Sequence, residues 1–334
     1  MTFPTAMLRA GFPYLTTRGM RRVTTFPMDS ALGSEGRIYV LGRTEMGVGG
    51  SIRIINWEDE DLGTMADTGL TWPVCLLADE DEVLWVSDEG AHTITTFNRD
   101  GEQLAQWGEH GAEPGQLNRP SGIAFDGDGN LLVVDTWNHR VQRFSRDGSY
   151  IDGFGSQGED NGEFDMPWGT TVDAEGSIYV ADWRNDRVQK FDAAGNHLAT
   201  IGRSGDGEGE FNRPAGLAVD ADGDLYVADR GNNRVQIFDH RGRYVEQFLG
   251  DATISKMGRA YIMANQKTLR LREMTALEPQ KRFRAPASVR VDAEGHLYIA
   301  DFGSHRIQIY KKEAYPLAAD EIMPELRSPT LMTT

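Results

Sequence analysis

Short apolar runs alternate with tight polar turns along most of the chain. The runs are rich in Val, Ile, Leu, Tyr and Phe, and Asp-Gly or Glu-Gly turns separate many of them. Residues of these types favour strands, and turns of this kind join neighbouring strands into hairpins. In one segment we expect strands at 216–219, 225–228, 235–238 and 244–248. The pattern predicts units of four antiparallel strands.

This four-strand unit occurs six times. Each copy begins at a proline, and the intervals between these prolines are 46, 47, 47, 47 and 72 residues. Repeats of this length, with four strands each, are typical of the blades of a β-propeller. We therefore predict an all-β, six-bladed propeller as a single domain over residues 1–317, followed by a tail at 318–334. The blades begin at Pro27, Pro73, Pro120, Pro167, Pro214 and Pro286.

The last unit lacks a clear outer strand. Residues 314–317 are the available candidate in that unit, but Pro316 interrupts them and is acceptable only on an edge strand. A propeller must close its ring, so we expect a piece of residues 8–25 to complete blade six.

The consensus sequence of the repeat resembles that of a known family. The unit P-x-G-I-A-V-D-x-x-G-x-I-Y-V-A-D-x-x-N-x-R-V-Q-x-F-D, with a Gly-rich connector ending in F-x-x-P, resembles the NHL repeat of six-bladed propellers. The resemblance covers roughly residues 26–310. It implies the fold but leaves the function open, because such propellers include RNA-binding regulators, protein-interaction platforms, extracellular sensors and a metal-dependent amidating lyase.

The longest interval between blades contains an insertion. Residues 251–283 have a helical composition, with Thr253 or Ser255 as the expected N-cap. Residues 251–285 hold eight basic and three acidic side chains. Two interpretations remain open: a helical hairpin packed on the rim, or a basic lid over the channel mouth.

Composition and charge restrict the partners. The formal net charge of −17 argues against broad contact with nucleic acid or an acidic membrane. The N-terminal segment has no apolar run long enough for a signal sequence, and the single cysteine, Cys75, excludes an internal disulfide. We therefore expect a cytoplasmic protein with no membrane or nucleic-acid partner.

Large aromatic and guanidinium side chains converge on one end of the predicted channel. They come from the connectors before the prolines and from the turns after the second strands. Arginine binds carboxylates and phosphates, and tryptophan offers stacking area. We predict a site here for a small anionic or aromatic ligand or a protein segment; the alternative is that the aromatic side chains only seal the ring. The candidate binding residues are Arg43, Trp72, Arg119, Trp137, Trp168, Trp183, Arg184, Arg213, Arg230 and Phe302.

One inner strand departs from the repeat. The fourth residue after the proline is small or apolar in the five other blades, where it is Ala, Leu or Thr, but it is Arg290 in blade six. A buried arginine keeps its charge and needs a partner, and Asp29 on the neighbouring inner strand is the expected one. The pair either clamps the ring closure, or Arg290 binds an oxyanion in the channel. Arg290, Asp29 and Glu45 are the candidate catalytic residues.

No metal site is predicted. His92, His139 and His305 share one turn position, but turns on different blades lie too far apart for metal–nitrogen bonds of ~2 Å to one ion. In the amidating lyase that the resemblance suggests, the zinc histidines follow the blade prolines, and no copy here has histidine there. The cofactor therefore stays unknown, and a metal-dependent hydrolase or lyase remains among the alternatives.

Aspartates and arginines that recur in nearly every blade have a different interpretation. A catalytic residue is needed once, whereas a stabilising residue is needed in each blade. We therefore predict that Asp88, Asp135, Asp182, Asp229 and Asp301 brace the turns, together with Arg140, Arg187, Arg234 and Arg306. Two function classes remain: a binding module, or a hydrolase or lyase acting in the same pocket.

Overall fold

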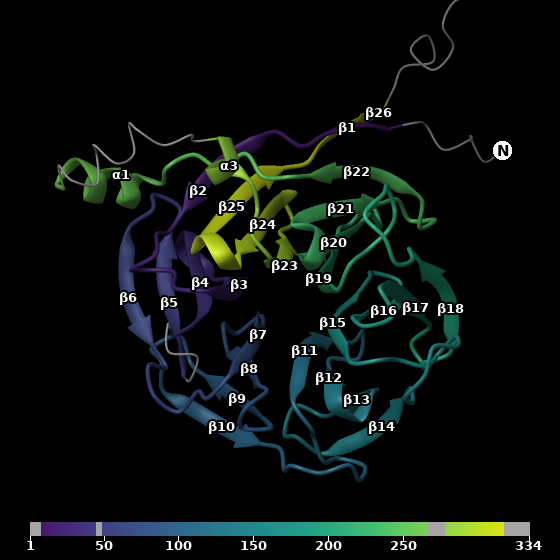
Figure 1. The fold of residues 1–334 in the computed structure, drawn as a ribbon. Helices are drawn as coiled ribbons and strands as arrows, with labels where there is room; N and C mark the ends of the chain where they lie inside the picture. The colour runs from purple at the N-terminus through teal and green to yellow at the C-terminus, as the bar shows by residue number, and fades with distance from the viewer. Residues whose placement is uncertain (1–7, 45–48, 266–277, 317–334) are drawn as a thin grey trace, which may run out of the picture.

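Six antiparallel sheets of four strands each surround a common axis in the computed structural model, which describes residues 8–44, 49–265 and 278–316 (Figure 1). The predicted six-bladed propeller is confirmed. Blade one contains β3 (Pro27–Leu32), β4 (Arg37–Arg43), β5 (Gly50–Asn56) and β6 (Asp61–Met65). Blade two contains β7 (Pro73–Ala78), β8 (Leu84–Asp88), β9 (Thr93–Phe97) and β10 (Gln103–Trp107).

The next three blades follow the same order from the axis outward. Blade three contains β11 (Pro120–Phe125), β12 (Leu131–Asp135), β13 (Arg140–Phe144) and β14 (Tyr150–Phe154). Blade four contains β15 (Pro167–Val172), β16 (Ile178–Asp182), β17 (Arg187–Phe191) and β18 (His197–Ile201). Blade five contains β19 (Pro214–Val219), β20 (Leu225–Asp229), β21 (Arg234–Phe238) and β22 (Tyr244–Phe248).

Blade six combines both ends of the described chain. Its inner strands are β23 (Pro286–Val291), β24 (His296–Asp301) and β25 (Arg306–Lys311), and β2 (Tyr14–Arg18) pairs with β25 as the outermost strand. The expected segment of residues 8–25 therefore contains the strand that completes this sheet. The other candidate for that position forms β26 (Glu313–Pro316), which pairs instead with β1 (Leu8–Gly11) in a separate two-stranded ribbon.

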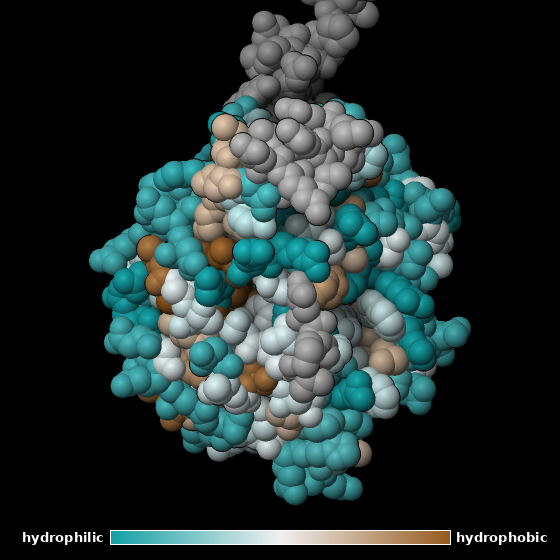
Figure 2. Space-filling model, turned by 60° about the vertical axis from the view of Figure 1, so that its left-hand side comes forward, coloured by the Kyte–Doolittle hydropathy of each residue, from teal (hydrophilic) through white to brown (hydrophobic). Residues whose placement is uncertain are grey.

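Burial explains why the second strand of several blades is a continuous apolar run in the sequence. Every residue of β8, β12, β16 and β20 is buried, because these strands are covered on both sheet faces by neighbouring blades. The outer strands β10 and β14 are mostly exposed. The surface in Figure 2 is accordingly mostly hydrophilic, with hydrophobic residues in small patches. No helix among the described residues is long and apolar enough to cross a membrane.

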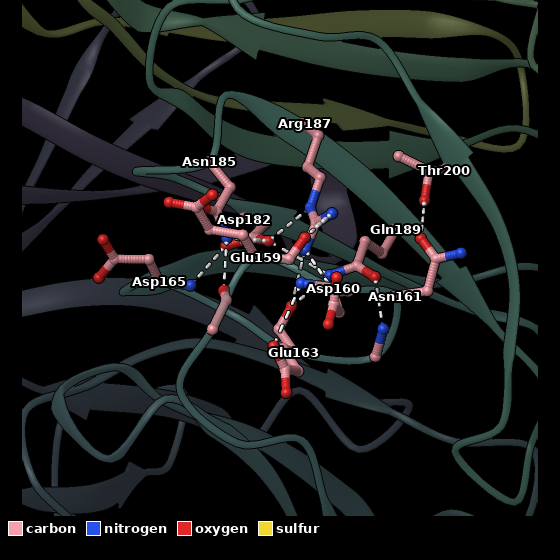
Figure 3. A network of polar contacts seen from close by, with 12 residues as sticks. Glu159, Asp160, Asn161, Glu163, Asp165, Asp182, Asn185, Arg187, Gln189 and Thr200 are labelled. Carbon is pink, nitrogen blue, oxygen red and sulfur yellow. Dashed lines mark hydrogen bonds and ion pairs between the residues drawn. The ribbon is translucent and has the colours of Figure 1, made fainter.

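A polar network repeats inside the blades, and Figure 3 shows the copy in blade four. The carboxylate of Asp182 accepts hydrogen bonds from the backbone N–H of Asp165 (2.8 Å) and from the side chains of Asn185 (2.9 Å), Arg187 (2.8 Å) and Gln189 (3.2 Å). Arg187 also donates to three backbone carbonyls of the connector that precedes the blade, those of Glu159, Asp160 and Glu163. The connector is thereby held against its own blade.

The same arrangement surrounds Asp135, Asp229 and Asp301, whose partners include Arg140, Arg234 and Arg306. Blade two differs, because the donors to Asp88 among the described residues are all backbone N–H groups, including those of Thr71 (2.6 Å) and Trp72 (2.8 Å). The recurring aspartates and arginines act as the repeat predicted, as structural braces.

The described part of the insertion lies on the rim. It contains α1 (Lys256–Met263), capped by the Ser255 side chain, which accepts a hydrogen bond from the Gly258 N–H (3.0 Å), and α3 (Glu278–Lys281). The buried carboxylate of Asp59 accepts the N–H of Met257 (2.7 Å) and that of Gly19 (2.7 Å), which holds the start of α1 beside blade one. Figure 1 shows α1 at the periphery, away from the ring centre. Helix α1 therefore does not cover the channel mouth; residues 266–277 lie outside the described residues.

Candidate functional site at the channel mouth

An apolar plug fills the axis where the inner strands begin. Met28, Val74 and Ala287, each the residue after a blade proline, are buried together, and Trp168 and Phe302 pack against them. A cavity of about 30 Å³ lies beside this plug and is lined by residues of the inner strands. A cavity of this size has room for one or two water molecules, since about 10–15 Å³ of such volume holds one. An organic ligand would therefore have to bind above the plug, at the mouth.

The expected ion pair between Arg290 and Asp29 forms beside this cavity. Arg290 Nε donates to Asp29 Oδ1 (3.0 Å), and Nη2 donates to Asp29 Oδ2, to the carbonyl oxygen of Leu76 (3.1 Å) and to the Cys75 sulfur (3.2 Å). Asp29 also accepts the Leu76 N–H (2.9 Å). Burial lowers the pKa of Arg290, but the Asp29 carboxylate outweighs it, so the net pKa is raised. These contacts clamp the ring closure and occupy most of the donors that an oxyanion would need.

Cys75 does not provide a nucleophile in this position. Complete burial raises the pKa of its thiol to about 12, despite the nearby Arg290 charge. A cysteine reacts as the thiolate, so this thiol is inert at neutral pH.

Glycines set the width of the channel on the opposite side. A Cβ on Gly122 would lie 2.6 Å from the Trp168 carbonyl oxygen, and one on Gly169 would lie 2.1 Å from the Ala215 carbonyl oxygen. Blades three, four and five therefore pack closely at their inner strands. The Arg290 cluster lies on the other side, where Asp29, Cys75 and Ser288 replace glycine at this repeat position.

Above the plug, guanidinium groups stack on aromatic rings. The distances from each guanidinium carbon to the ring centre are 4.2–4.9 Å, within the range of cation–π contacts. Two further ring contacts lie in this layer: Trp168–Trp183 (6.0 Å) within blade four, and Phe26–Phe302 (5.1 Å), which links blade one to blade six. The structure thus brings nine of the ten candidate binding residues into this layer or the plug, whereas Arg184 stacks on no aromatic ring among the described residues. The stacked pairs are Arg43–Trp72, Arg119–Trp137, Arg213–Trp183 and Arg230–Phe302.

Two of these arginines place poorly compensated positive charge at the mouth. Arg43 Nε donates to the Pro73 carbonyl oxygen (2.9 Å). Burial lowers the pKa of Arg43 to about 10, and the nearby charge of Arg230 acts in the same direction, against the opposing effect of Glu89. Burial also lowers the pKa of Arg230, whose Nη1 is buried and has no hydrogen-bond partner among the described residues. A buried donor without a partner carries a desolvation cost that a bound anion would remove.

Glu89 is a site residue that the sequence reasoning missed. Its side chain is 10% exposed, and its carboxylate lies 3.5 Å from Arg43 Nη2 and 3.4 Å from Arg119 Nη1. Burial raises the pKa of Glu89 in spite of both arginines. The available signal was a departure from the repeat, because the same turn position holds Arg43, Thr136, Trp183, Arg230 and Phe302 in the other blades. The third candidate catalytic residue, Glu45, lies outside the described residues.

The histidines that share one turn position join blades. Nδ1 of His92, His139 and His305 accepts the backbone N–H of the residue before the next blade's proline, at 3.0, 3.1 and 3.0 Å. Asp186 and Asn233 make the same contact with oxygen atoms. Each ring therefore has a structural task, because it holds its blade to the residue that leads into the next one. The described residues hold no group of three or more His, Cys, Asp or Glu arranged for a metal ion.

A larger cleft of about 890 Å³ lies between blades four and five, lined by their strand turns. Many of its charged groups form ion pairs. Lys190 contacts Asp173 (3.2 Å), and Lys312, beside the cleft, contacts the carboxylates of Asp220, Asp222 and Asp224 at 2.6–2.8 Å. The mouth, with its partly unsatisfied arginines, is therefore the stronger candidate site.

Comparisons with known proteins agree with the fold. The family model described as NHL repeat matches residues 117–144, 164–191, 211–238 and 283–310. A catalytically inactive virginiamycin B lyase from Staphylococcus aureus, solved with quinupristin, is 14% identical with a TM-score of 0.55, covering 94% of this chain and 90% of that one. A streptogramin B lyase is 11% identical with a TM-score of 0.55, covering 91% and 98%.

A structural genomics protein of unknown function from Bacteroides thetaiotaomicron is 17% identical with a TM-score of 0.63, covering 92% of this chain and 76% of that one. A search of curated sequences finds no match. At these identities the likeness concerns the fold alone.

Proposed function

Because the chain is a six-bladed β-propeller that carries NHL repeats, we propose that it binds a small aromatic anion at the mouth of its channel. The observation that carries this proposal is Arg230: its buried Nη1 has no hydrogen-bond partner in the part of the chain that the structure describes, and Arg43 adds a second positive charge nearby. A carboxylate, sulfonate or phosphate group would supply the missing acceptor through charge-assisted hydrogen bonds.

The surrounding rings favour a planar ligand. Phe302 and Trp168 form the upper part of the plug, and Trp183 lies against Trp168. A ring resting on these side chains would gain offset or edge-to-face contacts. We favour a small molecule over a protein segment, because the free donor of Arg230 is buried and a small group reaches it more easily.

The second candidate function is a hydrolase or lyase acting at the same mouth. Glu89, a buried acid with a raised pKa, offers a group for proton transfer, and environments of this kind are common at catalytic sites. Two structural relatives are named as lyases, at 14% and 11% identity. Binding remains the first proposal because the described residues present no activated nucleophile at the mouth.

Benzenesulfonate and benzyl alcohol would test the proposal, since they share a ring but differ in charge. Titration calorimetry should show benzenesulfonate binding to the wild type and to Arg241→Gln, which alters an exposed arginine in the cleft between blades four and five. Arg230→Gln should lose most of this affinity, and benzyl alcohol should bind none of the three proteins. Equal binding of benzenesulfonate by Arg230→Gln and the wild type would overturn the proposed site.

A further inference from the structure

We infer that Glu89 selects the anions that the mouth accepts: ionised, it occupies the arginines, and protonated, it donates a hydrogen bond to the bound anion. This inference rests on the proposed function and assigns a specificity-determining residue to the same site. It requires no chemical change in the ligand. The proton on Glu89 comes from solvent.

The position of Glu89 is fixed, whereas its ion pairs are loose. Its backbone N–H donates to the Trp72 carbonyl oxygen (3.1 Å) directly after β8. Its contacts with Arg43 (3.5 Å) and Arg119 (3.4 Å) are longer than the roughly 2.7–2.9 Å of a strong charge-assisted hydrogen bond. The carboxylate is therefore close enough to compete with a ligand for both guanidinium groups, but it is not locked onto either.

Asp29, by contrast, is a carboxylate of the same protein whose hydrogen bonds fix it in place. It accepts from Arg290 Nε (3.0 Å) and from the backbone N–H groups of Ser30 (2.8 Å) and Leu76 (2.9 Å). Among the described residues no backbone N–H donates to the Glu89 carboxylate, and its two arginines come from blades one and three. The difference marks Glu89 as the exchangeable carboxylate.

The charges around Glu89 couple its proton to the ligand. Arg43 from blade one and Arg119 from blade three favour the ionised form, whereas burial and the adjacent Asp88 oppose it, and the net result is a raised pKa. An anion held by Arg43 and Arg230 adds negative charge beside Glu89 and raises this pKa further. Binding must then take up a proton. By linkage, the same anion binds more tightly as the pH falls through the pKa of Glu89.

The ligand class follows from this arrangement. The anionic group needs one oxygen for the guanidinium groups and a second for the protonated Glu89 carboxyl. Carboxylates, sulfonates and phosphates meet this requirement. Neutral aromatic molecules do not, and they would gain nothing from protonation of Glu89.

Benzenesulfonate is a suitable probe because it stays ionised between about pH 5.5 and 8.5, so any pH dependence belongs to the protein. Calorimetry in two buffers with different ionisation enthalpies should show proton uptake by the wild type and tighter binding at the lower pH. Glu89→Gln, which imitates the neutral carboxyl, should bind about tenfold more tightly at the higher pH, with no proton uptake. The exposed Glu113 provides the control variant Glu113→Gln, which should behave like the wild type.

The outcomes separate this inference from the proposed function. If benzenesulfonate binds the wild type without proton uptake, or if Glu89→Gln keeps the wild-type affinity and pH dependence, Glu89 is not the selecting residue, while the anion site stands. If Glu89→Gln does not fold, the proton uptake of the wild type still decides. If benzenesulfonate binds neither protein at any pH, both the proposed function and this inference are wrong.

Discussion

Arg290 and Asp29 form an ion pair that joins blade six to blade one, and through Leu76 the same two residues reach blade two. Contacts at two distances from the ring axis therefore stabilise the ring closure. This cluster acts near the axis, and the pairing of β2 with β25 acts at the outer edge.

Arg290→Met should destabilise the propeller without weakening ligand binding in the folded protein. The substitution leaves Asp29, which is 3% exposed, without its cation, and removing one partner of a buried pair costs about 3–5 kcal/mol. Urea unfolding measures the loss. The double variant Asp29→Asn with Arg290→Met should recover part of it, because no buried charge remains unpaired. An unchanged unfolding midpoint for the single variant would show that the cluster does not support closure.

Gly169→Ala should destabilise the ring because the inner strands of blades four and five have no room for a methyl group. The new Cβ would lie 2.1 Å from the Ala215 carbonyl oxygen, and forcing extra atoms into a packed interior costs about 1–3 kcal/mol. Gly127→Ala is the matched control, since a Cβ there meets no atom within 4 Å. Thermal unfolding midpoints measure the difference. Equal midpoints for the two variants would contradict the prediction.

The contact of His92 should make stability depend on pH. Its Nδ1 accepts the Arg119 N–H (3.0 Å) and must be unprotonated, and burial, followed by the charges of His110 and Arg119, lowers its pKa below 6.5. The unfolded chain then binds this proton more readily than the folded one. The stability from His92 is complete above pH 6.5 and decreases as the pH falls through the lower, folded-state pKa.

His92→Asn tests this pH dependence, because Asn233 makes the equivalent contact in blade five with a group that does not titrate. Unfolding midpoints measured across this pH range should change less in the variant than in the wild type. An identical pH profile for both proteins would mean that His92 does not contribute.

Asp59→Ala should loosen the N-terminal strand and the insertion together. The Asp59 carboxylate accepts the N–H groups of Gly19 and Met257, both at 2.7 Å, so one substitution leaves two donors without an acceptor. Hydrogen exchange followed by mass spectrometry should show faster exchange in β2 and α1, with the inner strands unchanged. The exposed Asp67 supplies the control Asp67→Ala, the same change at the surface of the chain. Unaltered protection of both segments would contradict the role of Asp59.

The repeat made the blades predictable in detail. The strands expected at 225–228 and 244–248 correspond to β20 (Leu225–Asp229) and β22 (Tyr244–Phe248). Several copies of one pattern reinforce each other, and burial on both sheet faces produces the apolar runs directly. The Arg290–Asp29 pair was predictable for the opposite reason, because a charged residue on an inner strand breaks the pattern.

The mouth was predictable only in part. Its arginines and aromatic residues follow from the blade positions, but the importance of Glu89 depends on Arg43 and Arg119, which approach it from two other blades. The position of α1 was equally unpredictable from the sequence. The hydrogen bond that holds it joins Met257 to Asp59, which lies 198 residues earlier in the chain. Relationships between distant, non-equivalent residues leave no periodic trace in a single sequence.

The ribbon of β1 and β26 has a practical consequence. Leu8 faces Pro316 in antiparallel register, so the two ends of the described chain leave the ring at one place on its outer edge. A short peptide linker could connect these ends, and new termini could be opened in an exposed hairpin between two blade strands. The propeller is thus a good starting point for circular permutation, with the channel mouth left untouched.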